Sequence, residues 1–296
     1  MKICLSCFSP LLLEADWHCS HCSWYPQQYG KIPLFAPQMA YYNMNYDPIW
    51  YEELARLEAG NFWFVARNRL IAYLAKRYVP ENSKYMEIGC GTGFVLQMMR
   101  VTFPEWDMLA TDTLLEGIAF AQKRAPEGMP FLQMDACAIP FRDEFEVIGA
   151  FDVLEHIPDD NAAIRQIHMA LKDDGIFLAS VPQHRFLWSK YDEASCHHRR
   201  YGAHDLEQSL KKASFSILVS TSFNALLMPL MLLSRYLRNA KKNEDVDMMA
   251  ELKLSPLMNR LLAIVLHVEY WFIQFGVRFP LGGSRIIVAR KNREMA

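Results

Sequence analysis

A glycine-rich turn behind an apolar segment is the feature of this sequence that points most directly to chemistry. It reads Glu87-Ile88-Gly89-Cys90-Gly91-Thr92-Gly93 and follows the apolar pair Tyr85-Met86. Glycines at alternate positions let the backbone pass close to a ligand and turn sharply into a helix, which we expect over 94–101. Glu87 would repel a pyrophosphate at the helix N-terminus, but it suits an ammonium group. Because S-adenosylmethionine presents an ammonium group there, the turn favours this cofactor.

Two further acids could hold the rest of such a cofactor. Asp112 ends the segment 107–112, 19 residues after Gly93, which is close to the spacing of a ribose-binding carboxylate. Asp135 follows the segment 131–134 and could accept a hydrogen bond from the adenine amino group. Strands also end in Asp for turn chemistry alone. Three acids at the ends of three successive strands nevertheless favour a nucleoside-type ligand.

With these residues the chain resembles the class I S-adenosylmethionine-dependent methyltransferases, over about residues 60–222 and the C-terminal strand. The resemblance implies an α/β fold with a Rossmann-like sheet of seven strands, and methyl transfer as the reaction. It assigns cofactor binding to Glu87, Gly89, Cys90, Gly91, Gly93, Asp112, Asp135, Ala136 and Asp152. The segment 145–156 is similar to the fourth strand and following loop of the subgroup that includes ubiquinone and menaquinone methyltransferases. Members of that subgroup often act on lipophilic quinols.

The elements that must position these residues alternate between strand and helix. After the fourth strand, a polar turn at 172–175 leads into a fifth strand over 176–181, which Pro182 ends. A sixth strand is expected over 215–222 and a final one over 284–290. In an open parallel sheet, ligands bind beyond the carboxyl ends of the strands. The catalytic centre should therefore lie beyond the fourth and fifth strands.

Asp152, Glu155 and His156 cluster at that edge. Methyl transfer from a sulfonium needs alignment and exclusion of water, and it needs a base only when the acceptor is protonated. For a hydroxyl acceptor, which makes O-methylation the favoured reaction, His156 is the best general base by residue type, and His184 is the next candidate. The alternative for His156 is a structural hydrogen bond that fixes the turn.

The spacing Asp152-x2-Glu155-His156 also resembles the E-x-x-E-H array with which some quinol and RNA 3′-end methyltransferases hold Mg²⁺. Here the first acid is Asp, whose shorter arm weakens the match. The remaining ligands would come from His184, His197 or His198. Catalysis assisted by Mg²⁺ is therefore a second hypothesis, and the first is catalysis by a histidine base without a metal.

The loop after the fifth strand carries a basic cluster that could bind an anionic acceptor. The predicted substrate-binding residues are Arg199, Arg200 and Tyr201. Arginines beside a cofactor pocket can clamp a carboxylate or phosphate. The alternatives are a solvated loop or ion pairs with Asp192 and Glu193.

Four cysteines near the N-terminus have the spacing of a zinc ribbon. Cys4-x2-Cys7 and Cys19-x2-Cys22 are separated by eleven residues. Two such knuckles can close a tetrahedron around Zn²⁺, and four thiolates leave no open position for water, so the metal would be structural. Disulfide pairing is the alternative. His18 and His21 are expected at the surface, and ordinary burial is expected for Cys90, Cys137 and Cys196.

Three regions follow from this pattern: a zinc ribbon over 1–30, a connector and first helix over 31–60, and a methyltransferase domain over 61–296. Residues 26–48 show little periodicity and read as a connector. Helical spacing over 50–78, broken near Asn61, predicts two helices that cover the cofactor.

A helical insertion over 223–280 departs from a minimal domain. We expect apolar helices over 224–238 and 256–275, separated by the charged linker 241–245. The second is too short an apolar stretch to span a bilayer. Arg260, His267 and Gln274 form a narrow polar stripe, and Glu269 points away from it. The pair suggests a pocket for a lipophilic acceptor or a surface that rests on a membrane; a dimer interface or a core cover is the alternative.

Composition limits the remaining classes. The 296 residues are 52% hydrophobic and carry a net charge of −2 with a pI near 6.5, so no global basic field favours nucleic acid. The N-terminal stretch lacks a secretory cleavage site, and we expect a cytoplasmic enzyme with a small-molecule acceptor. A ribosomal RNA base methyltransferase and a non-catalytic cofactor-binding scaffold are the other interpretations. The sequence leaves the oligomeric state open.

Overall fold

The computed structural model describes residues 1–11, 17–41, 49–239 and 253–293. A mixed sheet runs through the molecule in the order β1-β2-β5-β4-β3-β6-β7-β9-β8. Its strands are β1 (Gln27–Tyr29), β2 (Ile32–Leu34), β3 (Lys84–Ile88), β4 (Asp107–Asp112), β5 (Phe131–Gln133), β6 (Phe145–Phe151), β7 (Leu171–Pro182), β8 (Phe215–Phe223) and β9 (Ser284–Lys291). The seven strands from β5 to β8 in this order form the predicted Rossmann-like core, with β9 antiparallel to both neighbours.

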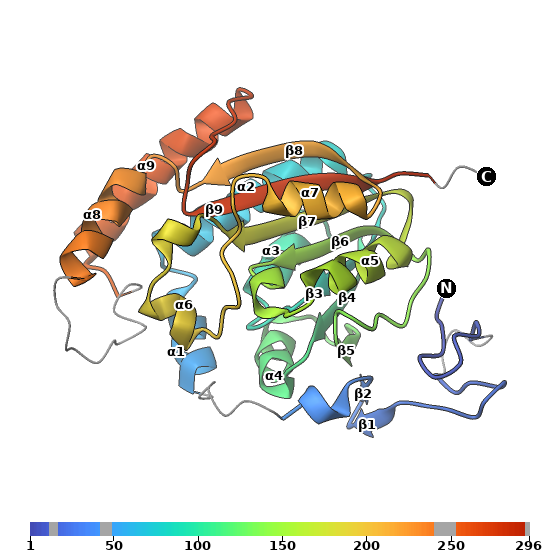
Figure 1. Cartoon of the computed structure of the whole chain (residues 1–296). Helices are drawn as coiled ribbons and strands as arrows, with labels where there is room; N and C mark the ends of the chain where they lie inside the picture. Colours follow the sequence, from blue (N-terminus) through green and yellow to red (C-terminus); the bar gives the residue numbers. More distant parts are fainter. Residues whose placement is uncertain (12–16, 42–48, 240–252, 294–296) are drawn as a thin grey trace.

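Helices cover both faces of the sheet, as Figure 1 shows. On one face lie α2 (Phe62–Tyr78), α3 (Phe94–Thr102) and α4 (Leu115–Arg124), whose apolar residues share one buried cluster. On the other lie α5 (Asp160–Ala170) and α7 (Asp205–Lys212), which share a second cluster. The central strands are buried on both faces, as expected for a parallel sheet between two helical layers. Their carboxyl ends, where the predicted site residues lie, meet at one edge.

The prediction of a connector over 26–48 must be corrected, because part of this segment forms strands. β1 and β2 make a hairpin that extends the sheet beside β5, so the described sheet has nine strands instead of seven. A boundary at residue 30 would cut this hairpin at its turn. The strand β1 escaped prediction because it is three residues long and exposed, with no buried face to impose an alternating pattern. Residues 42–48 of the connector lie outside the described residues.

β7 begins earlier than predicted. Its assigned bounds, Leu171–Pro182, include the polar turn at 172–175, where Asp174 has a positive φ of 61° and the register with β6 shifts. The buried part, from Ile176 on, is the strand that the sequence predicts.

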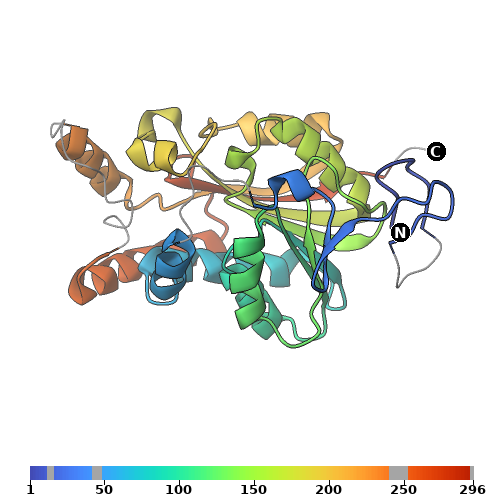
Figure 2. The ribbon, with the colours of Figure 1, turned by 90° about the horizontal axis from the view of Figure 1, so that it is seen from below.

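Both helices of the insertion are present as α8 (Met228–Asn239) and α9 (Pro256–Gln274). Figure 2 shows that they leave the sheet on separate paths, and α9 runs past α2. The predicted linker 241–245 lies outside the described residues. Among the described residues, no helix is long and apolar enough to cross a membrane.

The N-terminal segment packs against the loop that follows β5. The Ile3 amide donates to the Pro140 carbonyl at 3.1 Å, and Lys2 forms an isolated bridge with Phe141. Trp17 contacts the rings of Phe35 and Phe141, with centroids 4.6 and 5.5 Å away. The cysteine-bearing segment is therefore attached to the loop that begins with Asp135.

Candidate active site and cysteine cluster

The glycine turn between β3 and α3 has the conformation that its sequence predicts. Gly89, Gly91 and Gly93 all have positive φ, at 66°, 49° and 77°. A Cβ at Gly89 would lie 2.4 Å from the side chain of Val153, and one at Gly93 would lie 2.7 Å from the Ala121 backbone. Gly91 instead faces open space, with no atom within 4 Å of a built Cβ. Packing therefore explains the outer glycines, whereas Gly91 leaves room for a ligand.

Glu87 lies on the wall of the cavity beside this turn and is almost fully buried. The Tyr85 hydroxyl donates to its Oε2 at 2.7 Å. Burial raises the pKa of Glu87 to about 8, although the Tyr85 hydrogen bond and the nearby Arg67 oppose the shift. A ligand ammonium group would favour the ionised form of this carboxyl.

Asp112, at the end of β4, is engaged with the backbone of the turn. Its Oδ2 accepts from the Gly91 amide at 2.8 Å, and its Oδ1 accepts from the Leu114 amide at 2.9 Å. Burial raises the pKa of Asp112, and these hydrogen bonds oppose the shift. The carboxylate thus holds the turn against β4, next to the place where a ribose is expected.

Asp135 and Asp152 follow β5 and β6. Asp135 accepts from the Cys137 amide at 2.8 Å and is partly exposed. Asp152 has a positive φ of 56°, lines the cavity and forms an ion pair with Arg67 of α2. Arg67 lies on one of the two helices predicted to cover the cofactor, and the sequence analysis gave it no role. In the structure it ties that helix to the carboxyl end of β6.

A buried network that the sequence analysis missed joins the C-terminal end of α1 (Ile49–Leu57) to the turn and to α4. Glu58, 2% exposed, accepts from the Thr92 hydroxyl at 2.7 Å and forms an ion pair with Arg124 of α4. Arg124 also donates to the Ala55 carbonyl at 2.9 Å. These residues are far apart in the chain, and no local pattern connects them. The network supports the prediction that the first helices cover the cofactor region.

A cavity of about 490 Å³ extends from the glycine turn past the ends of β6 and β7 to the helical insertion. Its polar wall contains Glu87, Asp152, Glu155, His156, Tyr191, His197 and Arg200. Its apolar wall contains Phe62, Trp63, Leu227, Leu230, Met231, Leu254 and Leu262. This volume is in the range of sites that bury a small ligand. The predicted insertion thus contributes directly to the wall of the cavity.

Glu155, His156 and His197 meet at the polar end, with potential ligand atoms within 4.8 Å of one another. The loop returns to this place because the His198 amide donates to the Glu155 carbonyl at 2.8 Å. Glu155 is 1% exposed, and among the described residues its two carboxylate oxygens find no hydrogen-bond partner. Burial, followed by the charge of Asp152, raises the pKa of Glu155. Its carboxyl group is therefore protonated over a wider pH range than usual.

The His156 ring opens onto the cavity, and its environment keeps it neutral. Desolvation by the surrounding protein, followed by the nearby His197 and His198, lowers the pKa of His156. The His197 ring lies edge-on at 4.7 Å. His197 in turn contacts Asp192 through Nδ1, at 2.9 Å from Oδ1, so that its Nε2 can accept a hydrogen bond. Two imidazoles and one carboxyl thus face the cavity together.

Arg200 forms an ion pair with the buried Asp192, which was the predicted alternative to binding an anionic acceptor. Its Nε donates to Asp192 Oδ1 at 2.7 Å, and Asp192 is fully buried. Burial alone would raise the pKa of Asp192. The hydrogen bond with His197 and the charge of Arg200 outweigh this effect and hold the pKa of Asp192 well below its usual range. Arg200 lines the cavity, but its charge is already compensated.

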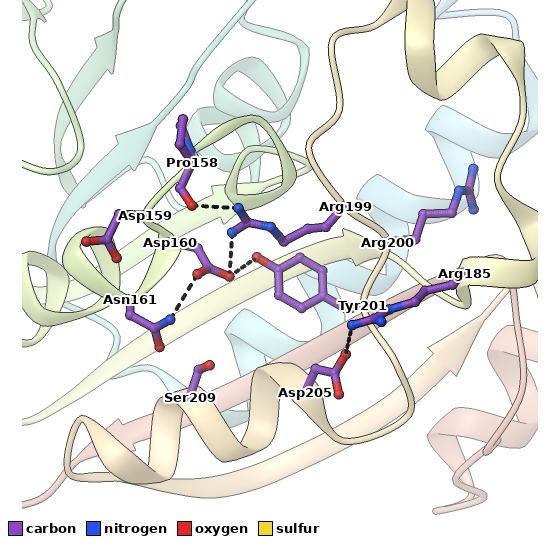
Figure 3. Close-up of a pocket in the computed structure, with 10 residues that line it drawn as sticks. All are labelled: Pro158, Asp159, Asp160, Asn161, Arg185, Arg199, Arg200, Tyr201, Asp205 and Ser209. Atoms are coloured by element: carbon purple, nitrogen blue, oxygen red, sulfur yellow. Dashed lines mark hydrogen bonds and ion pairs between the residues drawn. The ribbon is translucent and has the colours of Figure 1, made fainter.

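Arg199 and Tyr201 face a separate, smaller pocket of about 300 Å³, shown in Figure 3. Both point to Asp160: Arg199 Nη1 lies 3.0 Å from Oδ2, and the Tyr201 hydroxyl donates to Oδ2 at 2.7 Å. Arg200 points away from this group. All three predicted substrate residues border this pocket, but Arg199 and Tyr201 contact Asp160, and Arg200 is paired with Asp192.

His184 is also separate from the cavity wall. Its backbone has a positive φ of 63°, its amide donates to the Tyr201 carbonyl at 2.8 Å, and its ring stacks on Phe186. Desolvation, followed by Arg285 and Arg200, lowers the pKa of His184. Of the two predicted bases, His156 is the one that lines the cavity.

The four N-terminal cysteines form a compact cluster, with all Sγ atoms within 4.8 Å of one another. The two knuckles repeat the same hydrogen bonds: the Phe8 amide donates to the Cys4 carbonyl at 2.9 Å, and the Ser23 amide donates to the Cys19 carbonyl at 2.8 Å. Cys4 and Cys22 are 3.6 Å apart at Sγ, as are Cys7 and Cys19. Thiolates bound to zinc at about 2.3 Å would lie about 3.8 Å apart in a tetrahedron. The cluster therefore fits Zn²⁺.

The remaining cysteine and histidine predictions are mixed. All seven cysteines are free thiols. His18 and His21 are exposed, as predicted. Cys90 is buried, but Cys137 and Cys196 are only partly so, because both lie in loops at the sheet edge and not in the core.

Comparison with known proteins gives the family. A family model described as a methyltransferase domain matches residues 59–220. Trans-aconitate 2-methyltransferase of Variovorax paradoxus is 27% identical over 112 residues, which are 38% of this chain and 43% of that protein. Malonyl-(acyl-carrier protein) O-methyltransferase of Bacillus anthracis is 29% identical over 114 residues, which are 38% of this chain and 42% of that protein. The chain thus matches less than half the length of these two relatives.

A solved structure supports the fold. The complex between the Haloferax volcanii Trm112 methyltransferase activator and a methyltransferase contains a chain with a TM-score of 0.55, at 15% identity, over 82% of this chain and 98% of that one. At this identity the likeness shows the fold alone. Since the family model covers more than half of the 296 residues, the chain belongs to the methyltransferase domain family, and its fold is that of the class I methyltransferases.

Proposed function

We propose that this enzyme transfers the methyl group of S-adenosylmethionine to an oxygen atom of a small amphipathic molecule. The observation that carries the proposal is the two-sided cavity beyond the glycine turn. Its polar end offers Glu155, His156 and His197, and its apolar end is built from the insertion. An acceptor with a polar head and an apolar body would fill both. The names of the two relatives, one of them an O-methyltransferase, support an oxygen acceptor.

The protein's main contribution to the reaction would be positioning. Displacement at a sulfonium destroys charge, so that alignment and exclusion of water matter more than charge stabilisation. His156 is unprotonated and could accept the proton of a hydroxyl acceptor, but its lowered pKa makes it a weaker base than an ordinary histidine. His197, fixed by Asp192, could orient the same oxygen. A carboxylate acceptor would need no base, and there these residues would act by orientation.

The polar cluster does not fit Mg²⁺ well, and no step of this proposal uses that ion. Mg²⁺ prefers oxygen ligands in octahedral geometry, whereas this cluster offers two imidazoles and one carboxyl. Asp152, the first acid of the predicted array, is instead paired with Arg67. The arginine clamp is not part of the proposal either, because Arg199 and Arg200 already have carboxylate partners.

We also propose that Cys4, Cys7, Cys19 and Cys22 hold one structural Zn²⁺. The support is their mutual distance and the repeated knuckle hydrogen bonds. Bound there, the ion would supply folding energy that so short a segment cannot obtain from a core of its own. Metal analysis of the purified protein should give one zinc per chain.

A labelling experiment tests the class of acceptor. Purified protein is incubated with methyl-labelled S-adenosylmethionine and fractionated cell extract, and the label is followed into organic-soluble molecules, aqueous small molecules and RNA. Label in alkali-labile or ether-bound methyl groups of organic-soluble molecules supports the proposal. Label in RNA would replace it with the nucleic-acid alternative, and cofactor binding without any turnover would favour a scaffold.

Variants then test the polar end. Replacing His156 with alanine should lower kcat by about 10²-fold or more for a hydroxyl acceptor, the usual contribution of a positioned base. Affinity for S-adenosylhomocysteine should change little. His204→Ala is the matched control, because this histidine is exposed at the start of α7 and does not line the cavity. An unchanged kcat in His156→Ala would show that His156 is not the general base.

A further inference from the structure

The helix α9 exposes one long apolar stripe. It comprises Leu257, Leu261, Ile264, Val268, Trp271 and Phe275, with exposed fractions between 44% for Val268 and 82% for Phe275. Successive members are three or four residues apart, so they follow one face of the helix. Single exposed apolar residues are ordinary, but a continuous face of this length marks an interaction surface.

The opposite face of α9 is firmly packed, so the stripe is not a sign of a loosely placed helix. Leu266 and Ile273 are buried in the core cluster that includes α2. Glu269 is fully buried and accepts from the Leu226 amide at 2.8 Å. At its N-terminal end, Asn259 accepts from the Phe62 amide and donates to the Gly60 carbonyl, each at 2.9 Å. The stripe is therefore held outward on a fixed element.

Basic residues predominate among the exposed charged side chains near the stripe. The exposed charged residues of α2, of α9 and of the segments that flank α9 from 253 to 281 are Arg69, Lys76, Arg77, Lys253, Arg260 and Arg278. The one acid on these stretches, Glu269, is buried. Some of the cations have protein partners, such as Glu53 for Lys253 and His267 for Arg69. Within a chain of net charge −2, this face is locally cationic.

An apolar stripe on a cationic face fits an anionic phospholipid surface. A helix of this kind lies in the headgroup region with its apolar side toward the acyl chains, and nearby Lys and Arg add attraction to anionic lipids. A symmetric dimer through the same face would bring like charges together, because a two-fold interface apposes the same residues. Since no described helix can cross a membrane, contact would be limited to the surface.

The cavity adds a functional reason for this orientation. Leu262 lies on the inner face of α9 with Leu266 and Ile273 and lines the apolar wall of the cavity, as do Leu254 just before α9 and Leu230 of α8. Leu230 is itself 48% exposed. We infer that α9 docks the enzyme on an anionic phospholipid surface through the stripe, which would bring the lipid to the outer side of the helix that walls the apolar end of the cavity. The inference goes beyond the proposed reaction, because docking can be measured without turnover.

Vesicle binding of the full chain tests the inference. Purified protein is sedimented with vesicles of phosphatidylcholine alone and with vesicles that also contain phosphatidylglycerol. We expect binding to the anionic vesicles that weakens with salt. Trp271→Glu and Phe275→Glu should each abolish it. Arg260→Glu should weaken it by about 25-fold, because it removes one basic charge, worth about fivefold, and adds an acidic one of similar effect.

Matched controls and a mass measurement decide between the outcomes. Tyr29→Glu changes an exposed aromatic on β1 at the opposite edge of the sheet, and Lys211→Glu reverses an exposed charge on α7; both should bind like the parent protein. Two exposed sites on α9 are changed separately, so that one misfolded variant leaves the other informative. Absence of binding by the parent protein, or full binding by both α9 variants, overturns the inference. So does a dimer in light scattering that Trp271→Glu dissociates.

Discussion

Glu87 combines a buried carboxyl with a place beside the glycine turn, and we therefore predict that cofactor binding depends on pH. In the free protein burial raises its pKa to about 8, so the carboxyl holds a proton at pH 7. An ammonium group of the cofactor favours the ionised form. Binding at pH 7 should therefore release a proton, and affinity should rise as the pH approaches 8 and then level off as Glu87 becomes ionised without the ligand.

Calorimetry of S-adenosylhomocysteine binding in two buffers of different ionisation enthalpy measures this proton directly. In Glu87→Gln the release should disappear, and affinity should fall by about tenfold or more, because hydrogen bonds to charged groups contribute roughly 1.5–3 kcal/mol. Glu105→Gln, at an exposed position, should retain both the release and the affinity. Equal proton release in Glu87→Gln would show that another group, such as Asp112, is responsible.

Among the elements, the N-terminal hairpin and the cysteine segment enclose the loop that carries Asp135. Gln133 of β5 pairs its side-chain amide with the backbone of Ala36, at 3.1 and 2.8 Å. Beyond Asp135, the Ile3 and Met1 backbones bond to Pro140 and Arg142 at 3.1 and 2.9 Å. The loop is thus held on both sides by residues outside the methyltransferase domain.

Loss of zinc should therefore weaken cofactor binding, although no cysteine of the cluster lines the cavity. Cys19→Ser removes a buried ligand, and we expect affinity for S-adenosylhomocysteine to fall several-fold and residues 1–41 to become sensitive to protease. Cys196→Ser, which changes a cysteine outside the cluster, should have neither effect. If Cys19→Ser loses its metal but binds the cofactor as before, the N-terminal segment does not support the loop.

The same elements show how far the sequence could be interpreted. The glycine turn and the acids at the strand ends were predictable, because parallel strands end at a common edge and few residue types suit those positions. β1 was not predictable, because a short exposed strand has no periodic pattern. The Glu58–Arg124 pair was not predictable either, because it joins residues far apart in the chain. The convergence of His197 on Glu155 likewise depends on a long-range hydrogen bond. The clamp of Arg199 and Arg200 stays a prediction, and the sequence did not show which carboxylates pair with them, Asp160 and Asp192.

At the scale of the whole molecule, two potential metal sites lie in different parts of the fold, and they predict different responses to chelators. The cysteine cluster belongs to the N-terminal segment that bonds to residues 140–142 before β6 begins, and the cluster of Glu155, His156 and His197 follows the carboxyl end of β6. If Zn²⁺ is structural and methyl transfer uses no metal, a weak chelator that leaves zinc bound should leave kcat unchanged. A strong chelator that removes zinc should reduce cofactor affinity.

Measuring zinc content, kcat and cofactor affinity in the same samples separates these effects. Four thiolates hold zinc strongly, so the chelator concentrations that affect the two sites should differ widely. A fall in kcat while zinc content stays at one per chain would place a catalytic metal at the polar cluster. In that case Glu155→Gln, which removes the one carboxylate among the three metal ligands of the polar cluster, should abolish metal binding there. Its kcat should equal that of the chelator-treated parent protein, and the weak chelator should not lower it further. If kcat does not fall, we expect the buried carboxyl of Glu155, which has no hydrogen-bond partner among the described residues, to bind the acceptor. Glu155→Gln should then raise the acceptor KM.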